Sequence, residues 1–334
     1  KKVPSLWSSF LNNRLTGTFD WYRRNTKDML VAGATLPATL GASVPKSNSA
    51  DMKTIGWELS LGWNDRLENG FSYWVKGVLS DYQATITKYA GNDAGFYSQS
   101  DGDGKYYVGQ KIGEIWGYHS NGLFQSDDEA ATIDQSELYA GKWGAGDVKY
   151  EDLDNDGKIT KGEETIYNPG DKSIIGNKTP RYQFGITVGF DYKNFDFEMF
   201  WQGTGKRDYM LSGAQFWGFT SQWDVPYTPA LDYWTETNTD AYFPRPGWQN
   251  GGNRVTSDRY LQSAAYGRLK NLTVGYTIPK NLTTKWGISR LRLYVTGENL
   301  LTITPLNDAF DPETLGGMTY PINRKVAIGL NLTL

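Results

Sequence analysis

Residues 183–202 read QFGITVGFDYKNFDFEMFWQ. Large apolar side chains occupy the even positions up to residue 192, and the odd positions carry polar residues or glycine. After Lys193 and Asn194 the alternation resumes, with the apolar residues now at odd positions. Successive side chains of a strand point to opposite faces, so this stretch predicts a hairpin of two strands, each with one apolar and one polar face.

The same alternation recurs along the rest of the chain. It predicts further strands at residues 15–21, 57–63, 71–79, 272–278, 291–295 and 326–334. A shorter, broken strand is expected before Asn12 and Asn13. The chain therefore contains about eight full strands, each close to the ~9–11 residues that cross a bilayer at a tilt.

The connections between these strands alternate in length. Residues 64–69 and 193–194 form short turns, whereas residues 80–180, 207–263 and 302–322 form long connections. Short turns on one side and long loops on the other, with Trp and Tyr near the strand ends, are typical of an outer-membrane barrel. We therefore predict an all-β fold, an antiparallel transmembrane β-barrel whose long loops are extracellular. A soluble β-sandwich also alternates, but with shorter strands.

Composition narrows the function classes. The net charge of -3 and the pI near 5.4 give no basic excess, so we expect no nucleic-acid partner. The chain has no Cys, its one His is His119, and it contains neither a G-x-S-x-G nor an H-E-x-x-H motif. We therefore expect no enzymatic activity, since only carboxylate pairs of the glycosidase kind would remain as candidates.

An acidic motif occupies residues 152–163, DLDNDGKITKGE. Its carboxylates fall at positions 1, 3, 5 and 12 and its glycine at position 6, as in a calcium-binding loop. The expected Ca²⁺ ligands are Asp152, Asp154, Asp156, the Lys158 carbonyl, Thr160 and Glu163. Since no convincing helices flank the motif, we expect a structural ion; the alternative is a solvated acidic turn. Asp101, Asp103 and Gly104 repeat the pattern only weakly and are interpreted as a turn.

Aromatic residues are concentrated in the connection at residues 207–263. Flat rings beside amides and acids suit sugar rings, a protein interface or packing within the loop itself. Trp217, Trp223 and Trp234 are the candidates for contact with a ligand or with a partner that covers it.

Several runs carry a resemblance to a known family. They are GDVKYEDLDNDG at 146–157, IIGNKTPRY at 174–182, WQG at 201–203, GEIWGY at 113–118, RLKNL at 268–272 and GENL at 297–300. In these runs the chain resembles the SusC/RagA family of TonB-dependent outer-membrane proteins of Bacteroidota. The resemblance implies the C-terminal part of a barrel of about 22 strands, plugged by an N-terminal domain. The plug and the TonB-contacting segment are expected to lie outside this chain.

The resemblance also implies a function. Family members are active importers in the cell outer membrane, surrounded by lipid, driven by the TonB complex and covered by a SusD-like surface lipoprotein. Oligosaccharides or glycans are the more frequent cargo and peptides the alternative. A different class, a secreted calcium-stabilised glycan-binding β-protein, stays open on the sequence alone.

Overall fold

The structure is a computed structural model that describes residues 5–32, 39, 41, 45–97, 106–247, 249–315 and 320–334, so the weak acidic motif at residues 101–104 lies outside the described residues. Its main sheet contains β1 (Ser5–Phe10), β2 (Leu15–Ala32), β3 (Lys46–Arg66), β4 (Ser72–Tyr89), β9 (Arg181–Tyr192), β10 (Phe195–Lys206), β13 (Tyr266–Thr277), β14 (Arg290–Ile303) and β15 (Lys325–Thr333).

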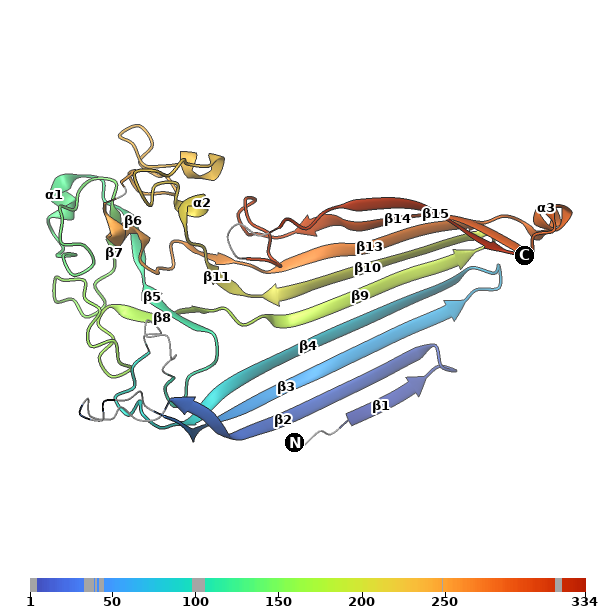
Figure 1. Cartoon of the computed structure of the whole chain (residues 1–334), viewed down its shortest axis with the longest axis horizontal. Helices are drawn as coiled ribbons and strands as arrows, with labels where there is room; N and C mark the ends of the chain where they lie inside the picture. The colour runs from blue at the N-terminus through green and yellow to red at the C-terminus, as the bar shows by residue number, and fades with distance from the viewer. Residues whose placement is uncertain are drawn as a thin grey trace.

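These strands pair antiparallel in the order β1-β2-β3-β4-β9-β10-β13-β14-β15 and form one broad, curved sheet (Figure 1). The predicted hairpin joins β9 and β10, with Tyr192 opposite Phe195 and Lys193 at a φ of 54° in the turn. Eight long strands and one short first strand confirm the predicted all-β, antiparallel fold. Within this chain the sheet is open, with β1 and β15 at its edges.

One face of the sheet is apolar across its width. Directly opposed residues of antiparallel strands lie on the same face. Val75 is opposite Val188, Val188 is opposite Met199, and Met199 is opposite Leu272. Further along the sheet Val295 is opposite Ile328. The register therefore joins the apolar sets of separate strands into one continuous surface, as the face of a barrel that meets lipid requires.

The opposite face is polar. On this face the Asp196 carboxylate accepts two hydrogen bonds from the Arg292 guanidinium, from Nη2 to Oδ2 at 2.5 Å and from Nε to Oδ1 at 2.9 Å. The pair spans β13 above Gly275, where a Cβ would lie 2.5 Å from both partners. Glycine leaves room for the two side chains to meet above β13, and a Cβ at this position would force one of them to shift.

An aromatic belt lies on the apolar face near the short turns. Phe71 and Phe190 have ring centroids 5.5 Å apart, Phe190 and Phe197 are 5.1 Å apart, and Phe195 and Tyr276 are 4.7 Å apart. Aromatic side chains in such a position mark the level of a membrane interface in outer-membrane barrels.

The first three long strands exceed the predicted length. β2 and β4 have 18 residues and β3 has 21, whereas β9, β10 and β13 have 12. At ~3.3 Å per residue, 18 residues span about 60 Å, twice the thickness of a hydrocarbon core. The strands are aligned at their short turns, where Ser72 is opposite Asp191 and Asp191 opposite Asp196, so the excess projects at the other end. Residues 80–89, predicted as loop, therefore belong to β4.

The long connections contain short elements. They are β5 (Glu114–Tyr118), β6 (Ser120–Leu123), α1 (Asp127–Ala130), β7 (Val148–Tyr150), β8 (Lys172–Asn177), β11 (Asp208–Met210), α2 (Ala214–Trp217), η2 (Thr228–Leu231), η3 (Gly251–Arg254) and β12 (Leu261–Ser263). The pairs are β5 with β8, β6 with β7 and β11 with β12. At the other end of the sheet, α3 (Lys280–Thr283) and η4 (Thr284–Trp286) join β13 to β14. None of the described helices is long and apolar enough to cross a membrane.

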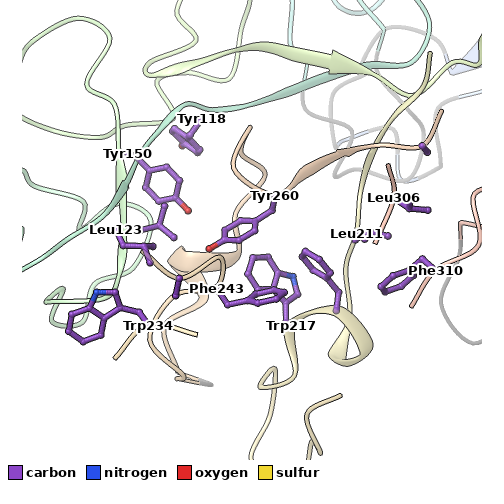
Figure 2. Close-up of a cluster of buried hydrophobic side chains, with 14 of the residues drawn as sticks. Tyr118, Leu123, Tyr150, Leu211, Trp217, Trp234, Phe243, Tyr260, Leu306 and Phe310 are labelled. Atoms are coloured by element: carbon purple, nitrogen blue, oxygen red, sulfur yellow. The ribbon is translucent and has the colours of Figure 1, made fainter. Parts of the chain in front are cut away.

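The largest buried core described lies in these connections and not on the sheet. Tyr118, Tyr150, Trp217, Tyr260 and Phe310 belong to one buried cluster (Figure 2). These residues come from three separate segments, 106–177, 207–264 and 304–315, which we call the loop platform. The apolar face of the sheet is exposed and packs against no other part of the described chain. The loop platform is therefore stabilised by a core of its own.

We predict that Ile186→Arg impairs barrel assembly strongly and Thr187→Arg does so weakly. Ile186 is on the apolar face, 39% exposed, and its neighbour Thr187 is on the polar face. Arg on a lipid-facing position near the midplane costs about 2–4 kcal/mol, and on the polar face it stays hydrated. The measurement is the yield of heat-modifiable, folded full-length protein in outer membranes. Equal yields of the two variants would contradict the assignment of faces.

Candidate functional site

The acidic motif forms a compact turn between β7 and β8. Asn155 and Gly157 adopt left-handed backbone conformations, with φ of 61° and 83°. Asn and Gly tolerate this region better than other residues, so the sequence suits the bends of the backbone at these two positions. The turn leaves Ile159 fully buried in the core of the loop platform.

Three predicted ligands come together. Carboxylate oxygens of Asp152, Asp154 and Asp156 lie within 4.8 Å of one another. Asp152 accepts hydrogen bonds from the backbone N–H groups of Gly157 at 2.7 Å and Asp156 at 3.2 Å. Asp156 accepts one from the Lys158 N–H at 2.8 Å. Three clustered hard oxygens fit the donor preference of Ca²⁺.

The charges of this cluster act on one another. Desolvation and the neighbouring Asp156 carboxylate raise the pKa of Asp154. For Asp152, desolvation acts in the raising direction, but hydrogen bonds from the Gly157, Asn155 and Asp156 N–H groups together lower its pKa. A divalent cation would relieve the repulsion that Asp154 experiences.

The other predicted ligands are placed differently. Glu163 is exposed and stands outside the group of clustered carboxylates, and its backbone N–H donates to Asn168 O at 3.0 Å. Lys158 forms a parallel β-bridge with Asp134. The Thr160 N–H donates to the Asp171 carboxylate at 2.7 Å, and the Thr160 carbonyl accepts from the Asp171 N–H at 3.1 Å. The described geometry thus assembles the first half of the predicted ligand set.

Asp171 is a structural residue that the motif does not contain. Its fully buried carboxylate accepts from Leu153 N–H at 2.8 Å and from Thr160 N–H at 2.7 Å. It therefore closes the loop by joining its beginning to its end. No sequence signal marks it, because its partners are backbone groups 11 and 18 positions away.

The three tryptophans separate into two kinds. Trp217 is 8% exposed and Trp234 is 7% exposed, both within the core of the loop platform, whereas Trp223 is 83% exposed. Trp217 packs edge-on against Tyr260 at 4.5 Å and contacts Phe243 at 6.0 Å. Of the three, only Trp223 is exposed enough to meet another molecule, whereas Trp217 and Trp234 stabilise the platform.

His119 has a defined place. Its Nδ1 lies 2.7 Å from Asp258 Oδ2, and its Nε2 lies 2.7 Å from Ser173 Oγ. Asp258 also accepts the Ser120 N–H at 3.0 Å. Serine hydrolases use the same three residue types, but here they cross-link β8, the β5–β6 junction and a neighbouring turn of the loop platform.

Comparisons with known proteins agree with this architecture. No known family profile matches the chain. TonB-dependent receptor P3 of Formosa agariphila is 29% identical over 354 residues, which cover 97% of this chain and 33% of the receptor. TonB-dependent receptor SusC of Bacteroides thetaiotaomicron is 26% identical, over 97% of this chain and 30% of SusC. The chain thus spans about a third of the length of these relatives.

The fold is shared with a solved structure. The structure described as the RagAB peptide transporter superposes with a TM-score of 0.75 at 20% identity, covering 99% of this chain and 34% of that chain. The sheet therefore has the fold of part of the wall of an outer-membrane β-barrel, and the sequence is similar to TonB-dependent receptors over 97% of the chain. More particularly, the chain is homologous to SusC, and the relatives are named as receptors and transporters, in agreement with the absence of enzymatic activity predicted from its motifs.

We predict that Asp171→Asn loosens residues 151–171 and leaves the barrel folded. An amide offers one acceptor oxygen in place of two, so a buried N–H loses its partner at a cost of about 1–3 kcal/mol. Hydrogen exchange of the full-length protein should become faster in this segment, whereas Glu151→Gln, at an exposed position, should have no effect. Unchanged exchange in Asp171→Asn would show that the carboxylate does not close the loop.

Proposed function

We propose that the full-length protein is an active importer of nutrients across the outer membrane. One observation carries the proposal: the sheet, apolar on one face and polar on the other, shares its fold over 99% of the chain with a transporter. The homology to TonB-dependent receptors over 97% of the chain supports the same function. It also favours a membrane protein over the secreted glycan-binding alternative.

For the cargo we propose oligosaccharides, on the resemblance to SusC/RagA proteins, with peptides as the second candidate. The peptide alternative is supported by the likeness to RagAB, which is described as a peptide transporter. The polar face of the sheet would line the lumen, and the loop platform would face the extracellular side.

The proposed partners follow from the similarity to SusC and to the RagAB transporter. A plug domain and a TonB-contacting segment in the remainder of the full-length protein would couple import to the TonB complex. A SusD-like lipoprotein would cover the loop platform, and lipid would contact the apolar face.

The import proposal is tested by deleting the full-length gene and measuring uptake. Cells lacking the protein should fail to accumulate fluorescently labelled oligosaccharides from the polymer on which the wild type grows. A plasmid copy should restore uptake, and it should not do so in cells without TonB. If the deletion strain lost uptake of labelled peptides and kept uptake of oligosaccharides, the second candidate would be favoured. Normal uptake of both by the deletion strain would contradict import.

The exposed Trp223 yields a prediction for the contact between the loop platform and the proposed surface lipoprotein. Trp223→Ala should weaken co-purification of the surface lipoprotein with the full-length barrel, because the interface would lose the apolar contact that the indole ring makes with the lipoprotein. Trp286, 61% exposed in η4 at the opposite end of the sheet, is the matched control. Equal co-purification of Trp223→Ala and Trp286→Ala would show that Trp223 is not in the interface.

We also propose a structural Ca²⁺ in the loop at residues 152–163. The support is the cluster of three carboxylates and the raised pKa of Asp154. Lys158, Thr160 and Glu163 are the further proposed ligands, and Glu163 would have to turn inward to reach the ion. An extracellular site needs only weak affinity, about 10⁻⁴–10⁻³ M.

We predict that Asp152→Asn with Asp156→Asn abolishes calcium binding. The loop should become protease-sensitive around residues 150–170, and the barrel should stay folded, since the strands do not depend on the ion. Asp127→Asn with Asp128→Asn, in α1 of the same platform, is the charge-matched control. Calcium retention by the Asp152 and Asp156 variant, measured by equilibrium dialysis of the full-length protein, would contradict the assignment.

A further inference from the structure

The apolar face of the sheet changes its character along β2, β3 and β4. Near the middle of these strands Phe19 is opposite Leu59, and Leu59 is opposite Leu79, so the face is apolar there. Two residues further from the short turns, Trp21 is opposite Trp57 on the same face. Beyond this pair of tryptophans the large apolar side chains give way to positively charged ones.

The two tryptophans lie at the far edge of the apolar band. Trp57 is nine positions from Arg66, which is opposite Ser72 beside the short turn. Nine positions span about 30 Å along a strand, and a strand tilt of about 40° reduces this to about 23 Å of membrane thickness. The apolar band of outer-membrane barrels is ~25 Å tall and ends in an aromatic girdle on each side. Trp21 and Trp57 therefore mark the girdle on the side of the loop platform.

Three cationic side chains share this face just beyond the girdle. Arg23 is opposite Ile55, and Lys53 follows two residues after Ile55 toward the loop platform. Lys53 is opposite Thr85, and Thr85 forms an antiparallel bridge with Lys111. Directly opposed residues lie about 5 Å apart and diagonal ones about 7–8 Å apart, so these long side chains can converge on one anionic group. We call Arg23, Lys53 and Lys111 the basic patch.

The positive charge of the basic patch is not neutralised within the described chain. None of its three residues forms an ion pair with any residue that the structure describes. Carboxylates nearby have other partners: Asp81, on the same face, is bound by Arg181, and Asp51 is opposite Lys88. Glu114 accepts a backbone N–H from the patch and a tyrosine hydroxyl. The patch is therefore free to bind an anion from outside the chain.

We propose that the basic patch binds the phosphate groups of the glycolipid in the outer leaflet of the outer membrane. The acyl chains of such a lipid would lie on the apolar face and end at the level of Trp21 and Trp57. Its phosphates, attached where the acyl chains meet the headgroup, would then be level with the patch. Guanidinium and ammonium groups are the usual protein partners of phosphate.

The level of the patch argues for a lipid over an acidic protein. The patch continues a face that meets lipid, and it begins at the depth where a phosphorylated lipid carries its charge. The inference goes beyond import and beyond the lipid contact of the apolar face. It requires only that the sheet crosses the outer membrane with the loop platform outside.

The polar face of the same strands supplies a matched control. Arg24 is opposite Thr54, and Lys76 is opposite Thr187, which places both cations on the polar face. Both are exposed, as Arg23 is. Arg24→Gln with Lys76→Gln therefore removes the same residue types and the same charge as Arg23→Gln with Lys53→Gln, but on the face that lipid does not reach.

The experiment measures lipid binding to the full-length protein in a neutral detergent by native mass spectrometry. The probes are lipid A with its phosphates and the same lipid after removal of the phosphates. Arg23→Gln with Lys53→Gln should bind phosphorylated lipid A at least about tenfold more weakly than wild type, because each cation near an anionic lipid surface contributes about a fivefold factor in affinity. Arg24→Gln with Lys76→Gln should bind as wild type.

A second variant keeps the test informative if the strand variant does not assemble. Lys111 lies outside the long strands and is exposed, so Lys111→Gln leaves the wall of the barrel intact. It should weaken binding of phosphorylated lipid A about fivefold. Binding of the dephosphorylated lipid should be weak in wild type and should not change in any of the variants.

The outcomes also separate the lipid from other anions. Equal binding of phosphorylated lipid A by the patch variants and by the control would overturn the site, as would equal binding of the two lipids by wild type. Full competition by inorganic phosphate at millimolar concentration would show a phosphate site that does not require a lipid. Tighter binding of polyglutamate than of lipid A would assign the patch to an acidic protein. Either result would overturn the proposal, whereas the uptake assay alone decides on import.

Discussion

Cross-strand register is the constraint on which the rest of the structure depends. In a bilayer every backbone N–H and C=O must be paired within the protein, and neighbouring strands satisfy this only by pairing along their length. A slip of one residue would turn every apolar side chain of a strand to the wrong face. The observed register avoids this, since Val75, Val188, Met199 and Leu272 follow one another across β4, β9, β10 and β13.

The position of the core follows from this constraint. A sheet with its apolar face toward lipid and its polar face toward a lumen has no interior of its own, so the long connections must be stabilised separately. They are stabilised by joining into one platform, in which Tyr150, Phe216 and Tyr260 are completely buried. The same platform holds the acidic loop and the exposed Trp223, so the proposed functions depend on one packed core at the end of the strands.

The sequence predicted the features whose signal is local. Alternation gave the strands, the hairpin at Lys193, and the antiparallel class, because a period of two is readable within a few residues. The grouping of Asp152, Asp154 and Asp156 was also predictable, since the turn that gathers them is encoded within the motif. The roles of Trp217 and Asp171 were not, because their partners lie on distant segments and only tertiary packing brings them together. Strand length was underestimated for β2–β4, where the strands continue beyond the apolar band.

The central claim is that the sheet crosses the outer membrane with the loop platform outside, and cysteine labelling tests it directly. The chain contains no natural Cys, so Trp223→Cys and Trp286→Cys can be introduced singly into the full-length protein after any other Cys is removed. Intact cells are treated with a membrane-impermeant maleimide. The account predicts labelling of Trp223→Cys in intact cells and of Trp286→Cys only after permeabilisation. Labelling of Trp286→Cys in intact cells, with Trp223→Cys protected, would contradict it.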